Sequence, residues 1–186
     1  MNIFFLDKDL TKCAEYHMDK HVVKMIVETA QLLCGAHHLL RQDEVINGKL
    51  VIPYKLTHKN HPCAIWARKS PANYLCLCNL GLALCTEYTH RYGKRHKSQD
   101  VMEWCLANYD KLASILTSLS EQKDTIGFTE PAMAMPPEYK VESDVVQSYR
   151  NYYIGAKAGF ATWKNRCTPY WFKPQQQQPV QVQITT

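Results

Sequence analysis

The stretch YHMDKHVVKMIVETAQLLCGAHHLL, residues 16–40, decides the fold class. On a helical wheel that turns about 100° per residue, it has an apolar face made of Met18, Val22, Met25, Thr29, Leu32 and Ala36. A second apolar patch on the far side is made of Val23, Val27 and Ala30. A helix that is apolar around most of its circumference is buried. We therefore predict a central helix over residues 11–40, with Asp9 or Thr11 as its N-cap.

One polar stripe crosses this otherwise apolar helix. Its members fall within about 80° of one another on the wheel, and they are His17, His21, Lys24, Glu28 and Gln31. Buried charges need partners, so we predict that the stripe lines a cleft filled by water or by a ligand. The alternative is an internal hydrogen-bond network in which Lys24 and Glu28 are simply paired one turn apart.

Start and stop signals predict further helices along the chain. Ser70 and Pro71 are typical of the N-cap and first position of a helix, and Gly93 is typical of the residue just past its end. We therefore expect one long helix from Pro71 to about Tyr92. Further helices are expected over residues 62–68, 98–119 (with Ser98 as the cap) and 143–163.

The connecting segments complete the predicted fold. Residues 2–6 are expected to be a short strand or a buried extended start, and residues 41–54 a small β-hairpin around Asn47-Gly48. Residues 125–140 carry three prolines and are expected to be a long loop. The fold class is thus mainly α, a compact single-domain helical bundle over residues 1–173. Residues 174–186 include four consecutive glutamines and are predicted to be a disordered low-complexity tail.

Composition restricts the class of protein. The formal net charge of +5 permits nucleic-acid binding without requiring it. The apolar run from Ile3 to Leu6 is too short for a signal peptide, so none is expected. The eight cysteines include Cys34, Cys78 and Cys85 at core-like helical positions. We therefore expect reduced thiols and a cytoplasmic protein. No apolar run approaches the roughly 20 residues that span a bilayer, so no membrane partner is expected.

A polar loop ahead of Pro62 supplies further candidate ligand-binding residues, which are His58, Asn60 and His61. Loops with such residues often carry function, and these side chains could converge with the polar stripe. The alternative is a structural loop whose side chains cap neighbouring backbone groups.

A metal site is the less favoured use of these histidines. His17 and His21 have the i, i+4 spacing of zinc ligands, but the stretch lacks the His-Glu-x-x-His pattern of zinc enzymes. Lys20 and Lys24 would also repel a cation. We therefore expect neither a metal nor a cofactor.

Two basic segments are candidate phosphate-binding regions. The first contributes Arg91, Lys94, His96 and Lys97, which could bind phosphates or offset the helix dipole. The second contributes Arg150, Tyr152, Trp163, Lys164 and Arg166. Interleaved rings and cations suit stacked bases and their phosphates, although the aromatic residues could equally face the core. Glycine-rich phosphate loops and nucleophile elbows are absent from the sequence.

Several of these stretches resemble those of small, uncharacterised proteins encoded by tailed bacteriophages. The similar stretches are YHMDKHVVKMIVETAQLL (16–33), THKNHPCAIWARKSPANY (57–74), EYTHRYGKRHKS (87–98), YRNYY (149–153) and WKNR (163–166). This resemblance implies a phage accessory protein.

The order of elements also resembles, more distantly, that of the helical pyrimidine-dimer DNA glycosylases. The resemblance implies a compact helical fold that binds DNA through basic residues and extracts a base from the stack. It also implies an N-terminal amine as nucleophile and a glutamate on the first helix. The sequence departs from that pattern because Asn2 is expected to leave Met1 in place, and because aligning His17 puts Lys24 at the position of the acid. Lys24 could supply the amine if burial lowers its pKa.

Three functions remain open at this point. The first is a DNA-processing enzyme of the base-excision, glycosylase-like type whose catalytic residues are Glu28, His21, His17 and Lys24. The second is a non-catalytic nucleotide-binding protein that sequesters a nucleotide signal of host defence. The third is a structural protein whose polar stripe is only an internal network. The first two predict nucleic acid or a nucleotide as the partner, and the sequence leaves the oligomeric state open.

Overall fold

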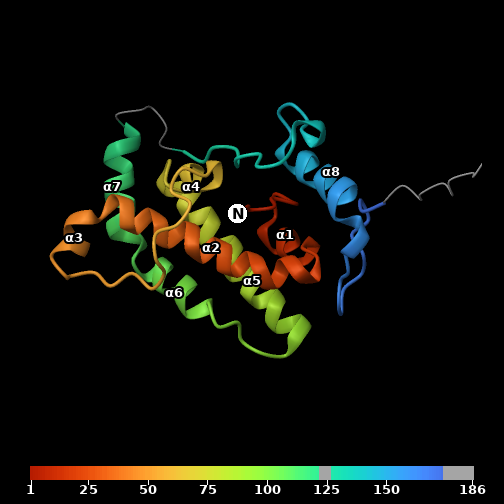
Figure 1. Ribbon diagram of the computed structural model, residues 1–186, viewed down its shortest axis with the longest axis horizontal. Coiled ribbons are helices and arrows are strands. Elements are labelled where there is room, and N and C mark those ends of the chain that lie inside the picture. Colours follow the sequence, from red (N-terminus) through yellow and green to blue (C-terminus); the bar gives the residue numbers. More distant parts are fainter. Residues whose placement is uncertain (122–126, 174–186) are drawn as a thin grey trace, which may run out of the picture.

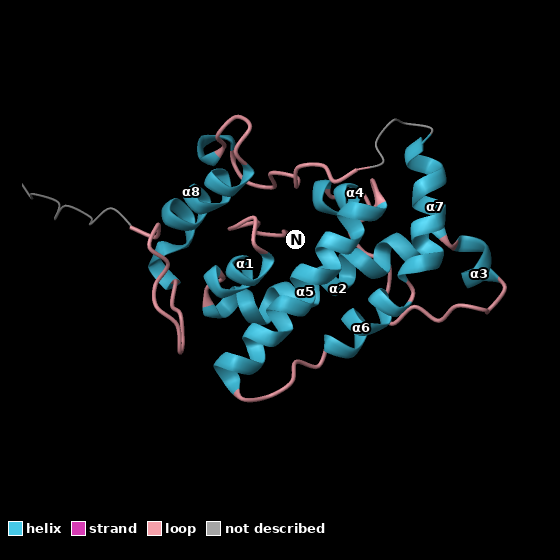
Figure 2. Cartoon of the chain, turned by 180° about the vertical axis from the view of Figure 1, so that it is seen from behind, coloured by secondary structure: helices cyan, strands magenta, loops and turns pink. Residues whose placement is uncertain are grey.

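The computed structural model describes residues 1–121 and 127–173. Two long helices, α2 (Asp19–Leu40) and α5 (Pro71–Tyr92), pack against each other at the centre of the molecule. The two views in Figures 1 and 2 place α8 (Val145–Lys157) and α7 (Tyr109–Glu121) at opposite ends of the long axis. The described residues form no strand, so the mainly helical fold class is confirmed. The predicted tail, 174–186, lies outside the described residues.

Shorter helices surround this central pair. They are α1 (Leu10–Tyr16), α3 (Gln42–Ile46), α4 (Pro62–Ala67) and α6 (Gln99–Ala107). Single 3-10 turns occur at Pro137–Tyr139 and Ala158–Phe160. In the described part of the chain, no helix is both long enough and apolar enough to cross a bilayer.

The predicted central helix is wrong in its continuity, because it breaks into α1 and α2. Asp9 caps α1 as predicted, with its carboxylate accepting from the N–H of Thr11 at 2.9 Å. His17 and Met18 then adopt extended backbone angles, with ψ of 131° and 159°. The side chain of Met18 is fully buried, and the N–H of Asp19 donates to the carbonyl of a distant residue, Thr162, at 2.8 Å. Tertiary contacts therefore set this break.

Local cap chemistry places α5 as predicted. Ser70 Oγ accepts from the N–H of Asn73 at 3.2 Å, and Gly93 ends the helix with a φ of 66°. The left-handed region costs glycine little because it has no Cβ. The N–H of Gly93 donates to the carbonyl of Thr89.

Three predicted elements need correction. The hairpin at residues 41–54 is absent, and helix α3 forms there instead, because Arg41 holds the carboxylate of Glu44 at 2.6 Å one turn away. The helix expected over residues 98–119 breaks at Asn108 into α6 and α7, and Ser98 makes no side-chain cap. The last helix starts at Val145 and ends at Lys157, short of residue 163.

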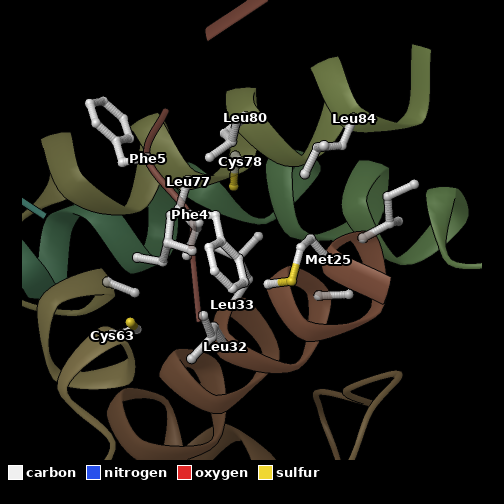
Figure 3. Packing of buried hydrophobic residues seen from close by; sticks show 14 of the residues in the cluster. Phe4, Phe5, Met25, Leu32, Leu33, Cys63, Leu77, Cys78, Leu80 and Leu84 are labelled. Carbon is white, nitrogen blue, oxygen red and sulfur yellow. The ribbon is translucent and has the colours of Figure 1, made fainter. Parts of the chain in front are cut away.

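The core lies between α2, α5 and the extended N-terminal segment. The whole predicted apolar face of α2 is buried, from Met18 to Ala36. The second apolar patch is only partly so, because Val23 is 40% exposed. Figure 3 shows Phe4 and Phe5 among the core side chains contributed by the central helices. The N-terminal segment is thus an extended core element rather than a strand.

At Gly81, helix α5 packs closely against Thr29 of α2 and Met102 of α6. A Cβ at this position would lie 2.9 Å from Thr29 Cγ2 and would also collide with the tip of Met102. We expect Gly81→Ala to lower the free energy of unfolding by about 1–3 kcal/mol through overpacking, measured by urea denaturation. Gly159→Ala is the control, because its Cβ would meet no atom within 4 Å. Equal stability of the two variants would contradict this packing.

Candidate functional site

The N-terminal segment meets α2 at Glu28. The main-chain N–H of Asn2 donates to Glu28 Oε2 at 2.9 Å. The α-amine of Met1 lies 4.0 Å from the same oxygen, and Lys24 Nζ lies 3.1 Å from Oε1. In both Figures 1 and 2 the N-terminus lies in the middle of the molecule, near α1 and α2. We call Met1, Lys24 and Glu28 the amine–carboxylate centre.

This centre lies where the core meets solvent. The Glu28 side chain is 12% exposed, whereas that of Lys24 is 67% exposed. The side chain of Met1 is only 2% exposed although the residue as a whole is half-buried, so the exposed part of Met1 is its backbone. The buried side chain anchors the residue and leaves the amine near the surface.

Asn2 organises the start of the chain. Its Nδ2 donates to the carbonyl of Ala134 at 2.7 Å, and its Oδ1 accepts from the N–H of Ile3 at 2.7 Å and of Phe4 at 3.3 Å. Phe4 adopts a φ of 53°, in the left-handed region. This conformation costs an L-residue roughly 1–2 kcal/mol. Phe4 is only 6% exposed, and burial of its ring offsets that cost.

The two histidines of the polar stripe are buried behind this segment. Phe4 stacks on His21, with ring centroids 4.2 Å apart, and His21 Nδ1 shares a hydrogen bond of 2.6 Å with Tyr153 Oη. His17 Nδ1 donates to the carbonyl of Cys13 at 2.7 Å, and its buried Nε2 finds no hydrogen-bond partner among the residues that the structure describes. Burial lowers the pKa of His17 to about 4 and that of His21 to about 3. Both imidazoles are therefore neutral near pH 7.

Solvent exposure therefore increases along the polar stripe, from His17 to Lys24. His17 lies outside α2 and is fully buried, His21 is 7% exposed, and Lys24 is exposed.

Two pockets lie elsewhere on the molecule. One, of about 430 Å³, includes Arg150 among its lining residues, and the other, of about 420 Å³, includes Phe128. Of the predicted site residues, only Arg150 lines either of these two pockets.

The loop before α4 plays a structural part as well as lying near the centre. His61 is the N-cap of α4, and its Nδ1 accepts from the N–H of Cys63 at 3.1 Å. Burial lowers the pKa of His61, and the positive α-amine of Met1 lowers it further. His58 and Asn60 are exposed.

The first basic segment divides into internal and exposed residues. Arg91 is fully buried, where it donates to Glu87 Oε1 at 2.6 Å and to Asp19 Oδ1 at 2.9 Å. His96 is 8% exposed, and its Nδ1 accepts from the N–H of Ser98. These two residues are buried and make hydrogen bonds within the fold. Solvent reaches the other two candidates, Lys94 and Lys97.

The second basic segment divides in the same way. Arg150 donates to Asp7, and Arg166 donates to Glu87, both at short range. Trp163 Nε1 donates to the carbonyl of Tyr16 at 3.0 Å. The remaining two candidates are a half-buried ring, Tyr152, and an exposed cation, Lys164.

Comparison of the chain with protein-family models, with curated proteins and with solved structures found no match. Across residues 1–121 and 127–173, the structure gathers no group of three or more metal-ligating His, Cys, Asp or Glu side chains. Periodicity identified Glu28 and Lys24 but missed Asn2, because a contact across 26 residues leaves no local signal.

The buried histidines make stability depend on pH. The folded-state pKa of His17 lies below its unfolded value of 6.5, so the unfolded chain binds more protons between pH 6.5 and about 4. The free energy of unfolding therefore falls as the pH drops through this window, by about 1.4 kcal/mol per unit for one such group. We expect His17→Gln to flatten this dependence, measured by urea denaturation at several pH values. His58→Gln, at an exposed position, should keep the wild-type slope; an unchanged slope in His17→Gln would contradict the assignment.

Proposed function

We propose that the protein is a DNA-processing enzyme of the base-excision type, and that the amine–carboxylate centre carries its chemistry. The observation behind this proposal is that two amino groups, those of Met1 and Lys24, lie within 4.0 Å of one partly buried carboxylate. An amine can replace a base at the C1′ carbon of a deoxyribose, and a neighbouring carboxyl group can move the protons that the exchange requires.

The proposed reaction balances with groups at this centre. The lone pair of a neutral amine attacks C1′ while the C1′–N bond to the base breaks and the base leaves with that electron pair. The leaving base takes up a proton from solvent water, and the attacking nitrogen gives its proton to the Glu28 carboxylate. Glu28, in its protonated form, then gives a proton to O4′ as the sugar ring opens to an imine. Water hydrolyses the imine, which frees the amine and leaves an abasic sugar.

The α-amine of Met1 is the better candidate for the nucleophile. The Met1 side chain is 2% exposed and anchors the residue, so its α-amine is held 4.0 Å from Glu28 Oε2. Lys24 is 67% exposed and paired with Glu28 at 3.1 Å. The burial that would make Lys24 a nucleophile is therefore missing, and its charge instead helps to hold Glu28 in place.

Exposed cations among the predicted phosphate-binding residues support a nucleic-acid partner. Lys94, Lys97 and Lys164 all reach solvent. Their phosphate contacts would supply sequence-independent affinity that falls with salt. His17 and His21 contribute by supporting the N-terminal segment, because their buried rings pack near Phe4.

Borohydride trapping on DNA that contains an abasic site tests this proposal. Reduction of the imine should link protein and DNA covalently, and peptide mapping should find the link at Met1. We expect Glu28→Gln to lower the trapping rate at least about 100-fold, since general acid–base catalysis contributes that much, and the amide can still accept from Asn2. Lys24→Gln should still trap DNA.

Glu142→Gln, at an exposed loop position, is the matched control and should trap at the wild-type rate. Thermal denaturation of each variant separates loss of chemistry from loss of folding. A folded wild-type protein that forms no link would overturn the enzyme proposal. If that protein retained a bound nucleotide through purification, the sequestering function would replace it.

A further inference from the structure

Three lysines lie over aromatic rings on the side of the molecule where α8 ends and α2 begins. Lys157 Nζ lies 4.7 Å from the ring centroid of Tyr152, and Lys20 Nζ lies 4.8 Å from that of Phe160. The third pair, Lys164 and Tyr92, has a corresponding distance of 5.3 Å. We call these three pairs the lysine–aromatic row.

Hydrogen bonds connect the row to the start of α2. The N–H of Asp19 donates to the carbonyl of Thr162 at 2.8 Å, and the N–H of Lys164 donates to the carboxylate of Asp19 at 2.9 Å. Lys20 follows Asp19 directly, and Lys24 lies one helical turn further on, with about 5–6 Å between their Cβ atoms. The row therefore continues along α2 to the amine–carboxylate centre.

The cations of the row have no carboxylate partner. In the described part of the chain, no ion pair joins the side chain of Lys20, Lys157 or Lys164 to an acid. Both Lys20 and Lys164 are exposed. A lysine that only covers a ring at the surface is weakly held, so a phosphate can draw it away and leave the ring face open.

The rings of the row differ in how open they are. Phe160 is 41% exposed, with Lys20 Nζ 4.8 Å from its ring centroid. Tyr152 is half-buried because it also packs against Tyr139 and Phe4, with ring centroids 5.2 Å and 6.0 Å away. Tyr92 is likewise half-buried. Each of the three rings is therefore at least partly open to solvent and has a lysine ammonium over it.

We propose that the lysine–aromatic row binds a single strand of nucleic acid, with phosphates on the lysines and unstacked bases on the rings. Alternating cations and aromatic faces are the means by which proteins bind single strands without reading sequence. Bases in a duplex are already stacked on one another and cannot reach these rings. The inference rests on the proposed function only in that the row would carry the strand toward Glu28, as base-processing enzymes require an unstacked base.

The test is the salt dependence of binding to a short fluorescein-labelled single-stranded oligonucleotide, followed by fluorescence anisotropy. A plot of log Kd against log salt should lose about 0.7 of its slope for each phosphate contact removed. Lys20→Gln and Lys157→Gln should each show this loss. Phe160→Ala should weaken binding at least about fivefold at fixed salt, while the slope stays as in the wild type.

Matched controls remove the same side chains elsewhere. Lys111→Gln changes an exposed lysine on α7, at the opposite end of the molecule from α8 (Figure 1). Phe128→Ala removes a 48% exposed ring that packs on Trp66. Both should bind the oligonucleotide as the wild type does, and duplex DNA of the same sequence should bind without a penalty from Phe160→Ala.

The inference is overturned if the wild type does not bind the oligonucleotide at low salt, or if the row variants behave as their controls do. Its failure is distinct from failure of the proposed function. If the row variants lose salt-dependence slope but the wild type never traps abasic DNA, the enzyme proposal is refuted and the lysine–aromatic row stands. If the wild type traps abasic DNA but the row variants keep the wild-type slope, the row is refuted and the enzyme proposal stands.

Discussion

The arrangement of the proposed site depends on one hydrogen bond, from the main-chain N–H of Asn2 to the carboxylate of Glu28. A hydrogen bond to a charged group contributes about 1.5–3 kcal/mol, more than the left-handed conformation of Phe4 costs. Glu28 comes from a helix that is otherwise buried in the core, so its position is fixed by packing. The bond therefore transfers the rigidity of α2 to the first residues of the chain, which would otherwise be free to fray.

Phe4 contributes both to the packing of the core and to the arrangement of the proposed site. Phe4 carries backbone strain, yet its ring fills the space between His21 and Tyr152. That ring keeps the imidazole away from water and so keeps it neutral. Strain of this kind persists only where surrounding structure over-determines it, and it is common at functional sites. The buried histidines are thus best understood as supports for the amine–carboxylate centre rather than as groups that meet a ligand.

Features of the fold that depend on neighbouring residues could be predicted from the sequence. Features that depend on contacts between distant residues could not. Ser70 and Gly93 bound α5 as expected because capping depends on neighbours in sequence. The break after His17 was missed because its cause is a buried Met18 and a carbonyl from residue 162. Glu28 was recognised as a candidate from its unusual place on an apolar helix. Arg91 was a candidate phosphate ligand, and its buried contact with Asp19, 72 residues away, could not be foreseen from local sequence.

The hydrogen exchange of the Asn2 amide, followed by NMR in the wild type and in Glu28→Ala, tests the central claim most directly. Amides this near the start of a chain ordinarily exchange fast, because nothing protects them. The account predicts slow exchange and a downfield-shifted proton in the wild type, with both lost in Glu28→Ala while amides within α5 keep their protection. An Asn2 amide that exchanges in the wild type as fast as in an unstructured peptide would contradict the account.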